Sequence, residues 1–176
     1  STIAIGSRYL QKNYELNLPI LSTPFASEKL TTNGKTLHAI ISPDGKSVIY
    51  TQGNGNEKQS IWLRQLETGN NVEIIPLSDD FYYGLVLSPD GNVLYFVRYP
   101  RGKQAERFDV FRVSIFGGIP TKILSQTEGW ISISPDGSRI SFVRCEGSDS
   151  GKCSLFIADS LDGNNEKKLV SRPRPL

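Results

Sequence analysis

The sequence lacks long apolar runs, a strong excess of charge of either sign, and methionine. No stretch approaches the roughly 20 apolar residues of a membrane-spanning helix, and the apolar start at residues 2–5 is too short for a signal-peptide core. The 20 basic and 18 acidic residues show no basic stripe, which argues against nucleic acid as a partner of this segment. Without methionine, Ser1 either follows a removed initiator or lies inside a longer chain.

What the sequence has instead is the tetrapeptide Ser-Pro-Asp-Gly, which begins at Ser42, Ser88 and Ser134 and is flanked by apolar runs each time. Proline fixes φ at a value that a turn needs, aspartate bonds the backbone two residues on, and glycine adopts the left-handed conformation without steric cost. We therefore predict tight turns between strands, and we prefer this to the alternative of three carboxylates on a ring that bind a cation. The predicted turn residues are Pro43, Asp44, Gly45, Pro89, Asp90, Gly91, Pro135, Asp136 and Gly137.

The constant offset between the turns predicts a repeat architecture. The strand around Leu94–Val97 does not alternate apolar and polar residues, so both of its faces are expected to be covered by other sheets. We predict an all-β fold of β-propeller blades, each with four antiparallel strands, at about residues 35–76, 82–124 and 130–170. Three blades do not close a ring. We predict that the chain is part of a larger propeller of six to eight blades, which supplies the remaining blades; the alternative is association with a second copy.

The two ends of the chain do not fit the repeat. We interpret residues 1–27 as a linker or irregular segment, with a short helix or juxtamembrane linker at residues 7–16. Residues 28–31 resemble the last strand of a repeat, so the partial propeller is expected to span 28–170. Residues 171–176 contain two prolines and two arginines and are predicted to be a linker.

The only cysteines, Cys145 and Cys153, flank a polar, glycine-rich loop between the predicted second and third strands of the last repeat. In an antiparallel hairpin their Cβ atoms fall opposite each other at disulfide distance. A disulfide would indicate an oxidising compartment such as a periplasm. The alternative is a pair of reduced thiols in neighbouring strands.

Aromatic and basic residues near one end of the repeats are candidates for partner binding. We place Tyr82, Tyr83 and Trp130 in loops that precede the first strands, where aromatic side chains anchor interfaces. Arg98 and Arg144 occupy the same repeat position at the end of the second strand, and two arginines near one rim suit an anion or a partner's carboxylate. The alternatives are packing between blades and ion pairs with Asp or Glu of a neighbouring blade.

Residues typical of catalysis or metal binding are few. His38 is the only histidine, no G-x-S-x-G motif is present, and we interpret His38 as structural or facing the axial channel. Asp159, Asp162, Asn164 and Glu166 resemble a calcium loop but lack the 12-residue spacing of an EF-hand. We therefore predict no catalytic residue, no cofactor and no metal site.

Residues 40–50, their two partner segments and the third strands at 61–64 and 111–120 resemble the TolB-type, WD-repeat-like β-propeller repeats of bacteria. The similarity extends to the C-terminal sensor propellers of bacterial kinases and winged-helix regulators, which usually follow a membrane helix. The resemblance implies a non-enzymatic, periplasmic or extracytoplasmic module that binds a protein or small ligand as the sensor or scaffold of a larger envelope or regulatory protein. A membrane tether would then lie outside this segment. The same blade also serves gating propellers of peptidases and propeller enzymes such as polysaccharide lyases, and these remain the alternatives.

Overall fold

A computed structural model describes residues 27, 29–31, 34–54, 58–101, 108–146 and 151–173. The chain divides into two units, Ser1–Thr32 and Asn33–Leu176. The described residues of the first unit form neither strand nor helix, so the strand expected at residues 28–31 is wrong for residues 29–31. Except for Ser27, the N-terminal segment interpreted above lies outside the described residues, as does the short helix expected at 7–16.

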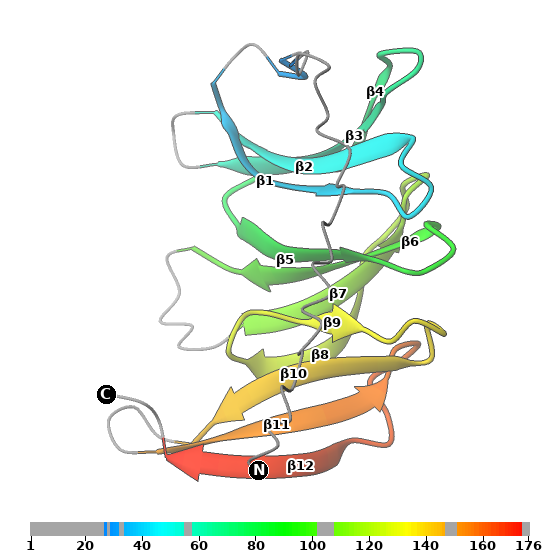
Figure 1. Ribbon diagram of the computed structural model, residues 1–176. Helices are drawn as coiled ribbons and strands as arrows, with labels where there is room; N and C mark the ends of the chain where they lie inside the picture. Colours follow the sequence, from blue (N-terminus) through cyan, green and yellow to red (C-terminus); the bar gives the residue numbers. More distant parts are fainter. Residues whose placement is uncertain are drawn as a thin grey trace, which may run out of the picture. The chain divides into compact units, whose positions relative to one another are not determined.

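The second unit contains three four-stranded antiparallel sheets that follow one another along the chain (Figure 1). Blade 1 consists of β1 (Thr36–Ile41), β2 (Ser47–Gly53), β3 (Gln59–Gln65) and β4 (Asn71–Ser78). Blade 2 consists of β5 (Phe81–Leu87), β6 (Val93–Tyr99), β7 (Phe108–Ser114) and β8 (Thr121–Thr127). Blade 3 consists of β9 (Ser132–Ile133), β10 (Arg139–Cys145), β11 (Lys152–Asp159) and β12 (Lys167–Pro173). The described chain contains no helix, and so none that could cross a bilayer, and the predicted all-β fold is confirmed.

Each Ser-Pro-Asp-Gly segment forms the turn between the first and second strands of a blade. In each turn the glycine N–H donates to the serine carbonyl at 2.8–2.9 Å, and the glycine φ lies between 71° and 75°. The serine hydroxyl donates to the aspartate Oδ1 at 2.5–2.6 Å. These hydrogen bonds stabilise the carboxylate, so the pKa values of Asp44 and Asp90 are lowered and that of Asp136 falls to about 2.

The turns of neighbouring blades also touch one another. A Cβ atom placed on Gly91 would lie 3.6 Å from Cδ of Pro43, and one placed on Gly137 would lie 3.2 Å from Cδ of Pro89. A closer approach occurs at Gly163 in the turn between β11 and β12, where a Cβ atom would lie 2.0 Å from the carbonyl oxygen of Ile123 in blade 2. Glycine is therefore required at this last position both by its φ of 77° and by the neighbouring backbone.

The cores lie between the blades rather than within them, since the apolar residues of each strand face the adjacent sheet. The first cluster joins blades 1 and 2 around Ile49, Ile61 and Phe96, and the second joins blades 2 and 3 around Val97 and Phe142. β6 contributes alternate residues to both clusters, which explains why its sequence does not alternate apolar and polar residues.

The last blade departs from the expected boundaries at both ends. Its first strand, β9, has only two residues, because the preceding segment at 128–131 does not pair as a strand. Its fourth strand continues through Ser171, Arg172 and Pro173, which pair with β11, so the predicted linker at 171–176 is wrong for these three residues. β12 is an edge strand, and a proline at its end leaves the ladder hydrogen bonds of the strand in place. Residues 174–176 lie outside the described part.

Candidate binding edge

The residues singled out for partner binding lie near one edge of the sheets, where the first strands begin and the second strands end. We refer to this as the first-strand edge. Its side chains come from β5, β6, β7 and the segment before β9. They include Phe81, Tyr83, Tyr99, Phe108 and Trp130. Phe108 contacts both Tyr83 and Tyr99, with 5.2 Å between ring centroids in each pair.

Tyr82 and Tyr83 lie within β5 and not in the loop before it, so the predicted loop position is wrong. The strand begins earlier because Tyr82 pairs with Arg98 in β6. The Tyr82 side chain is buried, packs edge-on against Phe96, and its hydroxyl lies 2.7 Å from the Ser78 hydroxyl. Burial raises the pKa of Tyr82. Tyr82 therefore joins blades 1 and 2 and has no free surface for a partner.

Tyr83 supports the segment that carries Trp130, and Trp130 is exposed to solvent. Tyr83 is half-buried, its pKa is raised by burial, and its Cε2 lies 3.4 Å from the Cβ position of Gly129. Gly129 has a φ of 105°, a conformation that glycine adopts readily, and Trp130 follows it directly. The Trp130 side chain is 73% exposed. The structure thus presents one large aromatic residue on a short segment that rests on a fixed tyrosine.

Arg98 and Arg144 are both engaged within the fold. Arg98 Nε lies 2.6 Å from Asp80 Oδ2, an ion pair without hydrogen-bond geometry, and the guanidinium stacks 5.2 Å from the Phe111 ring centroid. Asp80 lies in the turn that joins blade 1 to blade 2. Because its charge is paired with Asp80 and its guanidinium plane is stacked on Phe111, Arg98 stabilises the boundary between these blades.

Arg144 makes more contacts than Arg98. Both terminal nitrogens donate to Glu166, with a distance of 2.8 Å from Nη2 to Oε1, and Nε donates to the Ser125 carbonyl of blade 2 at 3.1 Å. The guanidinium also stacks over Phe142 and Phe156, at 4.9 and 5.6 Å from their centroids. The acidic partner lies in the same blade and not in a neighbouring one as expected, since the turn before β12 brings Glu166 back over β10. Neither arginine is available as a free anion-binding group.

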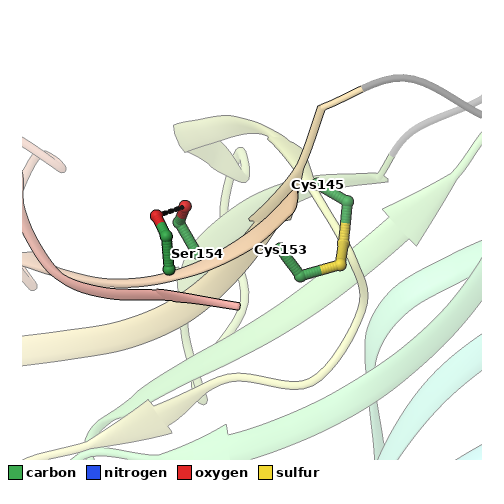
Figure 2. The surroundings of a disulfide bond; sticks show 4 residues. Cys145, Cys153 and Ser154 are labelled. Atoms are coloured by element: carbon green, nitrogen blue, oxygen red, sulfur yellow. Dashed lines mark hydrogen bonds between the residues drawn. A yellow bond between two sulfur atoms is a disulfide. The ribbon is translucent and has the colours of Figure 1, made fainter. Parts of the chain in front are cut away.

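Cys145 and Cys153 lie directly opposite each other in β10 and β11 and form a disulfide (Figure 2). Next to this bond, the hydroxyls of Ser154 and Ser171 lie 2.6 Å apart and connect β11 to β12. Closing so short a loop contributes about 2.5 kcal/mol to the free energy of unfolding on a chain-entropy estimate. The predicted disulfide is confirmed.

The candidates for catalysis and metal binding are not brought together. His38 is exposed on β1, and its backbone N–H donates to Thr51 Oγ1 at 3.1 Å. Asp162 accepts two bonds from Asn164 within its turn, Asp159 pairs with Arg139, and Glu166 is occupied by Arg144. Among the described residues, no group of three histidine, cysteine or carboxylate side chains is placed to hold a metal ion.

A cleft with a volume of about 700 Å³ lies at the opposite edge, between blades 2 and 3. Arg112, Asp90, Asp136 and Leu161 are among its lining residues. Asp90 and Asp136 are engaged in their Ser-Pro-Asp-Gly turns, and the cleft is open to solvent along the blade boundary. No local pattern in the sequence predicts this cleft, because it depends on how two blades meet.

Comparison with known proteins supports the fold and leaves the function open. No family model and no curated protein matches the chain. Among solved structures, putative TolB from Agrobacterium tumefaciens is 24% identical with a TM-score of 0.62, over 81% of this chain and 51% of that one. An oligogalacturonate lyase from Vibrio parahaemolyticus is 14% identical with a TM-score of 0.64, over 81% and 42%. The β-propeller domain of the Trilobed protease from Pyrococcus furiosus is 18% identical with a TM-score of 0.55, over 77% and 43%.

These likenesses define the class of protein. The three sheets are blades of a β-propeller, and the structural neighbours are TolB-type propellers, lyases and peptidase propellers. The chain spans about half the length of the Agrobacterium protein, and its three blades are consistent with part of a propeller. At these identities the likeness concerns the fold alone.

Proposed function

We propose that this chain is a non-enzymatic, TolB-like propeller segment that binds a protein partner through the first-strand edge, as the sensor or scaffold part of a larger bacterial envelope or regulatory protein. The observation that carries the proposal is Trp130, which is 73% exposed and held on a segment that contacts Tyr83. Tryptophan is enriched at the centres of interfaces because it buries a large area with few rotatable bonds. A rigidly supported, exposed tryptophan is thus suited to anchor a partner.

The disulfide between Cys145 and Cys153 supports an extracytoplasmic location, since such bonds persist in oxidising compartments. The enzymatic alternatives receive less support from the described residues. His38 is exposed on β1, whereas a catalytic histidine needs an orienting group and a nucleophile within reach. We therefore prefer a binding role to the gating propeller of a peptidase or a polysaccharide lyase.

Site-specific photo-crosslinking tests the proposal. The photoreactive residue p-benzoylphenylalanine replaces Trp130 in one variant and Phe116 in the control. Phe116 is 81% exposed but lies in the turn between β7 and β8, at the opposite edge. We expect a discrete adduct with one protein from position 130 and none from position 116. Adducts of equal pattern and yield from both positions, or none from position 130, would refute binding at this edge.

Affinity measurement with the captured protein then tests the role of the tryptophan itself. We expect Trp130→Ala to weaken binding by about tenfold or more, because loss of an aromatic anchor is among the largest single effects at interfaces. Phe116→Ala serves as the matched control and leaves the affinity unchanged. Equal affinities for the Trp130→Ala variant and the unaltered protein would show that Trp130 is not the anchor.

A further inference from the structure

Three positions that are equivalent in all three blades are buried in blades 1 and 2 but more exposed in blade 3. They lie on the second, third and fourth strands, on the face toward the following blade, and the strand register aligns them. In blade 1 they are Thr51, Ile61 and Ile75; in blade 2 they are Val97, Val110 and Leu124; in blade 3 they are Val143, Leu155 and Val170. All six positions in blades 1 and 2 are at most 5% exposed, whereas Leu155 is 36% and Val170 43% exposed. The outer face of blade 3 has the composition of a buried surface, but no sheet of the described residues covers it.

The faces that cover these positions in blades 1 and 2 share an aromatic pair. Blade 2 presents Phe96 stacked on Phe111 toward blade 1, with centroids 5.8 Å apart. Blade 3 presents Phe142 stacked on Phe156 toward blade 2, at 5.5 Å. Blade 1 carries the corresponding pair on its own outer face, where Tyr50 and Trp62 are directly opposite in β2 and β3. Trp62 is partly exposed, although Tyr50 beside it is 5% exposed. The chain therefore contains both halves of one further blade-to-blade contact.

The turn contacts and one hydrogen bond between neighbouring blades likewise lack a counterpart at the outer faces of blades 1 and 3 in the described chain. Pro43 and Pro89 contact the turn glycines of the next blade, but Pro135 has no glycine of a following blade in the described chain, and a Cβ atom on Gly45 would have nothing within 4 Å. Arg144 donates to the Ser125 carbonyl across the boundary between blades 2 and 3. At the open faces the equivalent residues are Gln52, whose amide can donate, and Ser171, whose carbonyl can accept.

We propose that a second copy of this chain completes these contacts, with the outer face of blade 3 of one copy on the outer face of blade 1 of the other. Two such contacts relate two copies by a two-fold axis and give six blades in total, within the range at which propellers close. Pairing blade 3 with itself is disfavoured, since it would bring Lys167 and Arg172 of the two copies together on facing surfaces. The interface is thus between two different faces, each used once by each copy.

Light scattering combined with size-exclusion chromatography gives the first test. We expect the unaltered chain to be a dimer, and Leu155→Arg or Trp62→Glu to raise the dissociation constant by at least about tenfold, because either charge would be buried at the contact. Leu161→Arg is the matched control, since Leu161 is 64% exposed in the hairpin turn of blade 3 and lies outside the proposed face. Far-ultraviolet circular dichroism confirms that each variant keeps its sheet content, and Gln52→Ala, a milder change on the blade 1 face, replaces Trp62→Glu if that variant unfolds.

Mixing the two variants distinguishes this arrangement from the pairing of like faces. The Leu155→Arg chain keeps an intact blade 1 face, and the Trp62→Glu chain keeps an intact blade 3 face, so the mixture restores one native contact. We expect the mixture to form a heterodimer although each variant alone is monomeric. A monomeric unaltered chain, a dimer that tolerates both substitutions, or a mixture that remains monomeric would each overturn the proposal. A monomer would leave the binding role of Trp130 untouched, because Trp130 lies outside both faces.

Discussion

Blades 2 and 3 have the same strands in the same order, yet they close their first-strand edges by different means. Where the second strand ends and the third begins, blade 2 has Tyr99 and Phe108 in ring contact, one residue beyond the last strand pair of Arg98 and Asp109, and blade 3 has the disulfide between Cys145 and Cys153. Blade 2 has a packed neighbour on both faces, whereas blade 3 has one on a single face within the described chain. Packing between rings thus closes this edge in the blade that has two described neighbours, whereas the blade that has one described neighbour has a covalent link there.

The largest expected difference in stability is between a residue buried between blades 1 and 2 and the equivalent residue on the outer face of blade 3. Ile61 and Leu155 occupy equivalent positions, but Ile61 is fully buried between blades 1 and 2. Ile61→Ala should lower the free energy of unfolding by about 2–5 kcal/mol, because it removes buried methyl groups and leaves a cavity. Leu155→Ala should cost less than about 1 kcal/mol in the monomer. Urea denaturation at a concentration where the chain is monomeric measures both, and equal losses would contradict the comparison.

The disulfide should have the next largest effect. Cys145→Ala combined with Cys153→Ala should lower the free energy of unfolding by about 2.5 kcal/mol, since the open chain regains the entropy that the short loop had removed. A reducing agent should destabilise the unaltered protein by a similar amount and should not affect the double variant. Thermal unfolding with and without the reductant checks both points. If full reduction leaves the stability of the unaltered protein unchanged, the disulfide of blade 3 adds nothing to the free energy of unfolding, and the contrast with the aromatic pair of blade 2 does not hold.

The smallest effect concerns the turns, which are the most similar parts of the three blades. Hydrogen bonds from Ser134 and Ser138 lower the pKa of Asp136 from 3.8 to about 2 in the folded protein. A depressed folded pKa contributes stability that is complete above pH 3.8 and is lost as the pH falls toward about 2. Asp136→Asn should therefore reduce the acid sensitivity of unfolding within this window, and Ser134→Ala should reduce it in part. Urea denaturation above and within the window measures the change; an unaltered pH profile would show that the turn carboxylate does not contribute.

The periodic features of the fold could be predicted from the sequence because they depend on local chemistry. Proline, aspartate and glycine at fixed positions define the turns, and a hairpin with a cysteine at each end places the two sulfur atoms opposite each other. The non-alternating apolar run of β6 correctly indicated sheets on both of its sides.

The details of the candidate site depend on contacts between distant segments, and these could not be predicted. Tyr82 became part of a strand because Arg98 pairs with it, and its burial follows from a contact with Ser78 at the end of the preceding blade. The sequence predicts a partner for Arg144 in a neighbouring blade, but the turn before β12 brings Glu166 of the same blade to it. The exposure of Trp130 depends on how its segment rests on Tyr83. Each of these outcomes requires knowledge of tertiary neighbours, which no local pattern contains.

Gly163 has a consequence for the geometry of the whole array. Because the backbone of blade 2 at Ile123 approaches this residue so closely, a methyl group there would have to push the two sheets apart along this edge. Moving one edge while the other stays in contact would change the wedge angle between successive modules. The number of blades that fit around a common axis is the full turn divided by that angle, so the absence of one carbon atom at position 163 helps to set how many such blades a closed ring would hold.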